Sequence, residues 1–134
     1  MQLVIDANIF FSALLKDSYS RRLILDGRIQ LFAPKFLLSE FEKHSADMLV
    51  RSKLDRDEFG RIYILLIQRI IFIEESELMP YLPAAYSLIV DKKDAPYVAT
   101  ALCVNAEVWS NDRHFRKGRV RNWATAELIS VAFE

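Results

Sequence analysis

The sequence contains few residues that cross-link a chain or interrupt its regular structure. Its 134 residues include one cysteine, three glycines and four prolines. The single cysteine, Cys103, excludes an internal disulfide and is typical of a reducing compartment. Low-complexity stretches, Ser/Gly linkers and internal repeats are absent, and 52% of the residues are hydrophobic. We therefore expect one compact domain over residues 1–134.

The chain also lacks a long apolar run and a net charge. Its N-terminus has no basic lead before an apolar run, so no signal peptide is expected. The most apolar stretch, 62–73, is interrupted by Gln68 and Arg69 and is too short to span a bilayer. These absences predict a cytoplasmic protein without membrane contact. Because Lys plus Arg and Asp plus Glu each number 18, only the local distribution of charge can indicate a nucleic-acid partner.

Short apolar runs alternate with segments of helical periodicity. Strands are expected at 3–5, 29–33, 70–73, 106–109 and 119–121, and helices at 8–15, 18–25, 34 to about 50, 55 to about 69, 84–89, 95–104 and 125–133. Gly27 suits a helix C-cap, Pro34 a first helical turn, and Asp55 an N-cap. This alternation predicts an α/β fold with a parallel sheet covered on both faces. The strand order does not follow from the pattern.

Asp6 directly follows the first apolar run, Leu3-Val4-Ile5. Ligands of open α/β sheets bind outside the carboxyl ends of the strands, so this carboxylate is a candidate site residue. An Asp at the same position can equally cap the following helix by accepting backbone N–H bonds. The residue by itself favours neither interpretation.

Further carboxylates are expected near the same edge of the sheet. Asp112 follows the predicted strand 106–109, and Asp94 begins a helix whose apolar face must pack on the sheet. Asp91, three residues earlier, could take the role of Asp94. In the predicted helix from Pro34, Glu40 and Glu42 border opposite sides of the apolar arc, and periodicity does not choose between them.

A group of desolvated carboxylates needs positive charge. Without it, neighbouring carboxylates would repel one another by several kcal/mol. Mg²⁺ prefers oxygen ligands and removes this repulsion. Two such ions could activate a water and stabilise the leaving oxygen of a phosphodiester. The pattern therefore favours phosphodiester hydrolysis.

Four segments, in order along nearly the whole chain, resemble the motifs of the PIN-domain nucleases. They are Val4-Ile5-Asp6-Ala7-Asn8, Phe36-Leu37-Leu38-Ser39-Glu40-Phe41, Lys93-Asp94-Ala95-Pro96-Tyr97-Val98-Ala99-Thr100-Ala101 and Val108-Trp109-Ser110-Asn111-Asp112-Arg113-His114-Phe115. The resemblance implies that Asp6, Glu40, Asp94 and Asp112, here called the acidic quartet, are the catalytic, metal-binding acids. It selects Glu40 over Glu42. It also implies that Asn8 orients Asp6 or a metal-bound water, and that Ser110 contacts the metal-binding residues without binding the metal itself.

The resemblance is strongest to small VapC-like ribonucleases, the toxins of toxin–antitoxin pairs. It implies a three-layer α/β/α fold with a five-stranded parallel sheet of order 3-2-1-4-5. It further implies a metal-dependent endoribonuclease that uses Mg²⁺ or Mn²⁺, forms a homodimer and has an antitoxin as a possible protein partner. The apolar helical segments 10–15 and 62–67 could be plain core, a dimer seam or an antitoxin groove.

Basic residues follow Asp112 directly: Arg113, His114, Arg116, Lys117, Arg119 and Arg121. Beside a metal site such a run would hold RNA phosphates, and we predict that Arg113, Arg116 and Lys117 bind the substrate. The alternative is a solvated basic loop. Trp109 and Trp123 bracket the run and could stack bases, but we expect both to be buried.

Other functions require residues that are absent here. A haloacid-dehalogenase-type phosphatase needs a second Asp two residues after the first, where this chain has Asn8. A receiver domain needs a phosphoacceptor Asp after the third strand, where this chain has Glu74 and Glu75. The remaining alternative is a PIN-like module that binds RNA or protein without cleaving.

Overall fold

Five parallel strands form the central sheet of the computed structural model, which describes residues 1–112 and 121–132. They are β1 (Gln2–Ile5), β2 (Gln30–Pro34), β3 (Ile70–Ile73), β4 (Glu107–Trp109) and β5 (Asn122–Trp123), in the order β3-β2-β1-β4-β5. Every neighbouring pair is parallel. The α/β class and the strand order implied by the resemblance are confirmed. The predicted substrate residues Arg113, Arg116 and Lys117 lie outside the described residues.

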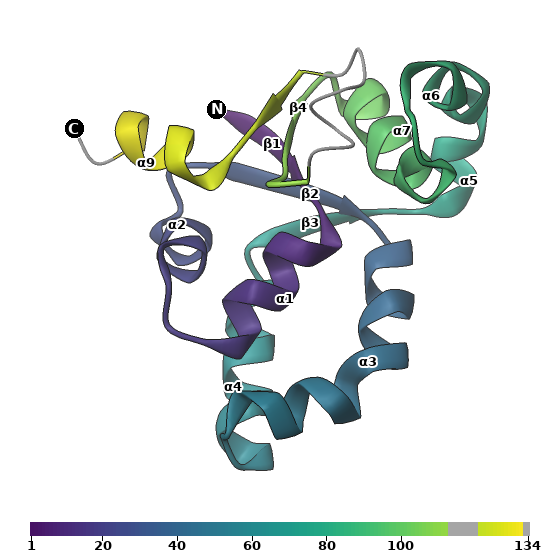
Figure 1. The fold of residues 1–134 in the computed structure, drawn as a ribbon. Helices are drawn as coiled ribbons and strands as arrows, with labels where there is room; N and C mark the ends of the chain where they lie inside the picture. The colour runs from purple at the N-terminus through teal and green to yellow at the C-terminus, as the bar shows by residue number, and fades with distance from the viewer. Residues whose placement is uncertain (113–120, 133–134) are drawn as a thin grey trace.

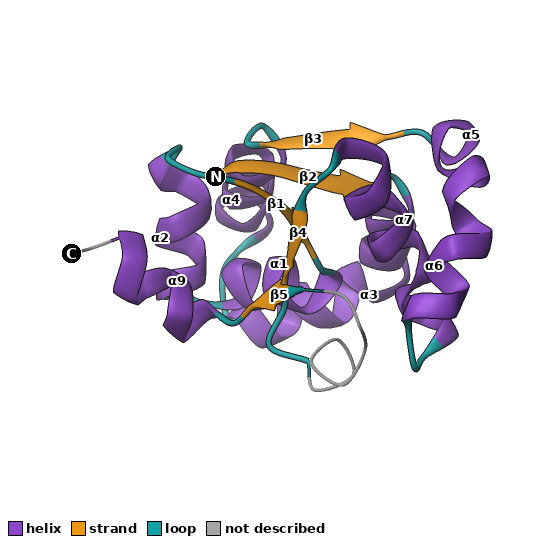
Figure 2. Ribbon diagram, turned by 90° about the horizontal axis from the view of Figure 1, so that it is seen from above, coloured by secondary structure: helices purple, strands orange, loops and turns teal. Residues whose placement is uncertain are grey.

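Helices cover both faces of this sheet (Figures 1 and 2). The helices are α1 (Ala7–Leu15), α2 (Tyr19–Asp26), α3 (Phe36–Ser52), α4 (Arg56–Ile67), α5 (Glu75–Leu78), α6 (Leu82–Leu88), α7 (Ala95–Val104) and α9 (Thr125–Ala132), with 3-10 turns at Met79–Tyr81 and Lys92–Asp94. Helices α1 to α4 lie on one face, with α9 beside α2, while α7 packs on the other with α5 and α6 against it. No helix in the described part of the chain has the length and apolarity to cross a membrane.

Two expectations about element boundaries were wrong. Pro34 is the last residue of β2 and pairs with Ile73, and α3 begins only at Phe36. A proline fits this strand end because the next N–H, that of Lys35, donates to the Ile73 carbonyl at 3.1 Å. Strand β5 comprises Asn122 and Trp123, and Arg121, the one described residue of the predicted strand 119–121, precedes it.

The core forms where the apolar faces of α1, α3 and α4 meet beneath the sheet. The strand residues Leu3, Val4 and Ile5 are fully buried. Below them the rings of Phe41 and Tyr63 stack with their centroids 4.4 Å apart. Because β1 lies in the middle of the sheet and is buried on both faces, the residue that follows it is held at a rigid position.

Thr125, at the start of α9, anchors the end of β4. Its hydroxyl oxygen accepts hydrogen bonds from the Trp109 indole N–H at 3.0 Å and the Asn111 amide at 3.2 Å. The Asn111 side-chain oxygen in turn accepts from the Thr125 N–H at 2.8 Å. Trp109 is fully buried, as expected, so its indole N–H has no access to water, whereas Trp123 is only partly buried.

Replacing Thr125 by Val therefore tests this anchor. The Thr125→Val variant keeps the side-chain shape but leaves the buried indole N–H without its acceptor, which should lower the free energy of unfolding by about 1–3 kcal/mol. Thr125→Ser retains the hydroxyl and serves as the matched control. Urea unfolding followed by tryptophan fluorescence measures both. Equal stability of Thr125→Val and Thr125→Ser would contradict the anchoring role.

Candidate active site

The strand order places β1 and β4 side by side at the point where the chain reverses its direction of winding. From β1 the chain proceeds to β2 on one side, and it later returns to add β4 on the other. In open α/β sheets this switch point opens a crevice at the carboxyl ends of the strands. The residues that directly follow β1 and β4 therefore lie next to each other.

Asp6 is both a helix cap and a member of this crevice. Its Oδ1 accepts a hydrogen bond from the Ile9 N–H at 2.8 Å, which caps α1. Its Oδ2 accepts a hydrogen bond from the Ser110 hydroxyl. The two interpretations that the sequence left open thus apply to different oxygens of the same carboxylate.

Ser110 joins the ends of β1 and β4. Its side chain is fully buried, and its oxygen also accepts a hydrogen bond from the Asp112 N–H at 2.9 Å. One hydroxyl therefore positions the Asp6 carboxylate and the backbone of Asp112. The structure places Ser110 directly against Asp6.

Glu40 reaches the crevice from the second turn of α3. The hydroxyl of Tyr97, on α7, donates a hydrogen bond to Glu40 Oε1 at 2.5 Å. Tyr97 is only 3% exposed, so this hydrogen bond is shielded from water. It connects α3 and α7, which lie on opposite faces of the sheet. Glu42, the alternative acid on the same helix, is exposed on the surface.

Asp94 precedes α7, and its side chain makes no capping hydrogen bond to that helix. Asp91 instead caps the 3-10 turn before it, accepting from the Lys93 N–H at 3.0 Å. This short turn brings both carboxylates to the crevice.

The acidic quartet meets in one small cavity of about 150 Å³, here called the acidic cavity. Its lining comprises Asp6, Ala7, Asn8, Glu40, Asp91, Lys93, Asp94, Tyr97 and Asp112. Two of these lining residues, Tyr97 and Lys93, are not among the site residues predicted from the sequence. The signal in the sequence for Tyr97 is that it lies three residues after Asp94, about one helical turn away. This spacing does not predict its partner Glu40, 57 residues away in the chain.

Burial and like charge act together on Asp6. The pKa of its carboxyl is raised to about 6, mainly by burial, with the hydrogen bonds from Ser110 and Ile9 lowering it and the neighbouring charges of Asp112 and Glu40 raising it. Burial and the hydrogen bond to Glu40 likewise raise the pKa of Tyr97, so its hydroxyl stays protonated as a donor. The cavity is therefore a place where positive charge is needed.

The donor atoms suit a hard divalent cation. Five carboxylates and the Asn8 amide line the cavity, with no sulfur or imidazole among the described lining residues. Within residues 1–112 and 121–132, no three Asp, Glu, His or Cys side chains are arranged to hold a metal ion together. Because Mg²⁺ is commonly held by one or two carboxylates and several waters, the donor set still fits such an ion.

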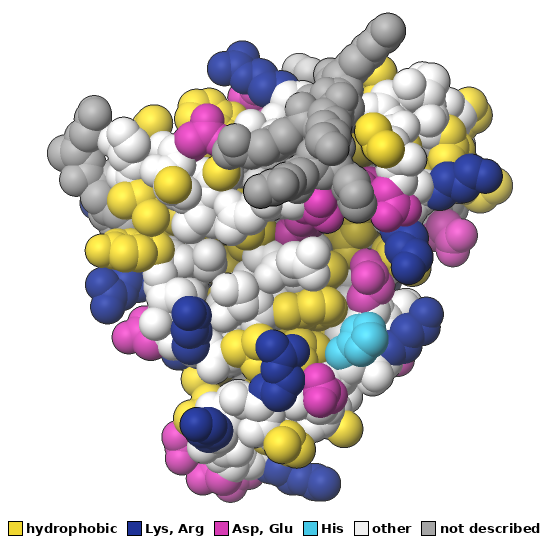
Figure 3. Space-filling model, viewed as in Figure 1, with side chains coloured by type: hydrophobic (Ala, Val, Ile, Leu, Met, Phe, Trp, Pro, Cys, Tyr) yellow, Lys and Arg dark blue, Asp and Glu magenta, His cyan; other side chains and the backbone are white. Residues whose placement is uncertain are grey.

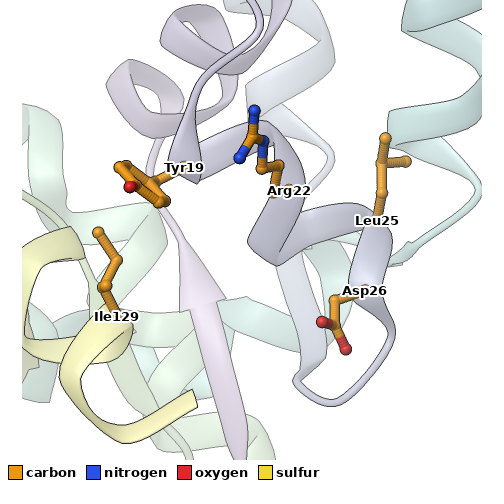
Figure 4. A pocket seen from close by; sticks show the side chains of 5 residues that line it. All are labelled: Tyr19, Arg22, Leu25, Asp26 and Ile129. Atoms are coloured by element: carbon orange, nitrogen blue, oxygen red, sulfur yellow. The ribbon is translucent and has the colours of Figure 1, made fainter. Parts of the chain in front are cut away.

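A different cavity, of about 680 Å³, lies between α2 and α9. Tyr19 and Ile129 face each other across it, and Arg22, Leu25 and Asp26 complete its lining (Figure 4). Its one lining carboxylate, that of Asp26, pairs with Arg28 at 2.9 Å. This cavity lacks the grouped acids that phosphodiester chemistry requires.

Comparisons with known proteins agree with this architecture. The crystal structure of VapBC2 from Rickettsia felis, bound to a DNA fragment from its promoter, contains a chain similar to this one, with a TM-score of 0.68 and 16% identity over 92% of this chain and 98% of that one. FitAcB from Neisseria gonorrhoeae matches with a TM-score of 0.54 and 16% identity over 94% and 99% of the two chains. No curated protein matches the sequence significantly. The sequence profile of the PIN domain matches residues 4–132, so this chain belongs to the PIN domain family.

Proposed function

We propose that this protein is a metal-dependent endoribonuclease that hydrolyses RNA phosphodiester bonds. The observation that carries the proposal is the meeting of the acidic quartet, from four separate segments of a PIN domain, in one cavity. PIN domains are in general nucleases. A cluster of acids around the buried Asp6, whose pKa is raised, is costly for stability, which favours a functional reason for it.

The acidic quartet would hold Mg²⁺ or Mn²⁺, with Asn8 beside it. When bound, such an ion activates water for attack and stabilises charge on the departing oxygen. Ser110 and the Ile9 N–H keep Asp6 oriented. Tyr97 holds one oxygen of Glu40, and Lys93 adds a positive charge at the cavity to attract a phosphate.

We further propose that the protein is a cytoplasmic toxin with an antitoxin partner. Support comes from its similarity to VapBC2 and FitAcB, which are toxin–antitoxin complexes.

We also propose a homodimer. On α4 the side chains of Ile64 and Leu65 are each 51% exposed, whereas the next residue, Leu66, is fully buried. Such exposed aliphatic residues suit a contact with a second protein chain.

Cleavage of a mixed-sequence single-stranded RNA tests the activity. With Mn²⁺ or Mg²⁺ the wild type should cut internally, and both EDTA and Asp6→Asn should lower the rate by about a hundredfold or more, because several kcal/mol of charge stabilisation is lost. Asp57→Asn, an exposed acid on α4, is the matched control and should cut normally. If wild type, Asp57→Asn and Asp6→Asn all fail to cut, while RNA still binds, the protein is a binding module instead.

The pH dependence of stability tests the environment of Asp6. Its folded pKa of about 6 lies above the ordinary value of 3.8. The folded state therefore binds this proton more tightly, which stabilises it below about pH 4, and this contribution is lost as the pH rises through 6. In EDTA, the unfolding free energy of the wild type relative to Asp6→Asn should fall by about 2–3 kcal/mol between pH 4 and 7.5.

Urea unfolding of both proteins across this pH range measures the difference. Mn²⁺ at pH 7.5 should stabilise the wild type and leave Asp6→Asn nearly unchanged, because the ion binds the ionised carboxylates of the folded state. A difference that does not vary with pH would show that Asp6 is ionised without penalty.

A further inference from the structure

A groove between α1 and α3 begins where the acidic cavity ends. It has a volume of about 670 Å³ and is lined by Asn8, Phe11, Ser12, Leu15, Lys16, Arg51, Ser52 and Lys53. We call it the α1–α3 groove. Asn8 also lines the acidic cavity, so the two hollows adjoin at this residue.

The acidic cavity and the α1–α3 groove differ in volume, and this difference indicates different roles in substrate binding. Sites that enclose a small organic ligand usually measure about 300–1,000 Å³. At about 150 Å³ the acidic cavity can take the reacting phosphate but not the nucleotides on either side of it. A polymeric substrate must therefore continue over the neighbouring surface, and the α1–α3 groove offers a path of sufficient size from Asn8 onward.

The charge of the groove is opposite to that of the acidic cavity. Its charged lining residues are Lys16, Arg51 and Lys53, all exposed, and no carboxylate lines it among the described residues. Arg51 pairs with Asp47 at 3.9 Å, but both side chains are more than half exposed, so this ion pair is weak. Basic side chains accordingly lie over the lower ends of α1 and α3 on the face shown in Figure 3. Such a groove suits a polyanion.

The floor of the groove is apolar. Phe11 and Leu15, on α1, are partly buried and line it. The Phe11 ring meets the His44 ring edge-on, with the centroids 6.2 Å apart, which holds it in place. An aromatic floor beneath cationic rims is the arrangement that binds single-stranded nucleic acid, because unpaired bases stack on rings while phosphates meet the cations.

We propose that the α1–α3 groove binds the single-stranded RNA that extends from the cleaved phosphodiester, with phosphates at Lys16, Arg51 and Lys53 and a base against Phe11. This inference rests on the proposed ribonuclease function and adds to it the surface that holds the substrate. It is separate from the predicted contacts of Arg113, Arg116 and Lys117.

Equilibrium binding in EDTA tests the groove without requiring cleavage. A fluorescein-labelled mixed-sequence single-stranded RNA is titrated with wild type and with the triple variant Lys16→Gln, Arg51→Gln, Lys53→Asn at several salt concentrations. Asn is chosen at position 53 because its backbone has a φ of 59°, which Asn tolerates well. The matched control is Arg28→Gln, Arg61→Gln, Arg69→Gln, three exposed cations that do not line the groove.

Each lost phosphate contact reduces the slope of log affinity against log salt by about 0.7. The groove variant should therefore lose about 2 units of slope and about a hundredfold in affinity at 0.1 M salt, whereas the control should change less than about threefold. Single substitutions of Lys16 or Arg51 should each lower the slope by about 0.7, which keeps the test valid if the triple variant folds poorly.

Several results would overturn the proposal. They are equal RNA affinity of the groove variant and the control, absence of RNA binding by the wild type, and equally tight binding of a blunt RNA duplex. Displacement of the RNA by polyaspartate at the same concentration of charge would assign the groove to an acidic polypeptide. Loss of RNA affinity in the groove variant of a protein that cuts no RNA would support the groove and refute the nuclease function, so the two failures are distinguishable.

Discussion

The burial of one carboxylate, that of Asp6, is the constraint on which the site depends. β1 lies in the middle of the sheet and is covered on both faces, so the residue after it cannot move away from its neighbours. Two hydrogen bonds hold this carboxylate, one from the N–H of Ile9 and one from the hydroxyl of Ser110. Burial and the negative charges of nearby acids oppose its ionisation, and a bound cation can offset that cost.

The burial of Asp6 among other acids also explains why the hydrogen bonds that hold these acids come from distant parts of the chain. Tyr97 connects α7 to Glu40 on α3, and Ser110 connects the end of β4 to the end of β1. Thr125 then holds the end of β4 through Trp109 and Asn111. Repelling acids are thus kept together by hydrogen bonds from helices and strands on both faces of the sheet. The positively charged α1–α3 groove adjoins the acidic cavity. The acids of the cavity suit catalysis, and the cations of the groove suit substrate binding.

Much of the fold and part of the site could be predicted from local patterns. The strands after which Asp6 and Asp112 lie were evident from their apolar runs, and the Asp55 cap forms as expected, accepting from the Glu58 N–H at 2.8 Å. Other features depend on partners far away in the chain. Pro34 suits a helix start as well as a strand end, and its pairing with Ile73 decides between them. The involvement of Tyr97 could not be inferred because its partner, Glu40, lies 57 residues away.

The sequence by itself determined the α/β class and the positions of the candidate acids, because hydrophobic periodicity and strand ends are local properties. Periodicity did not choose between Glu40 and Glu42; the resemblance to PIN domains did, and the structure places Glu40 in the cavity. Only the tertiary structure decided that Asp6 serves as cap and cavity wall at once, that Lys93 and Tyr97 join the acids, and that a cationic groove adjoins Asn8. These features depend on which surfaces of distant helices face one another, and that is settled by the packing of α1, α3 and α7 around the sheet.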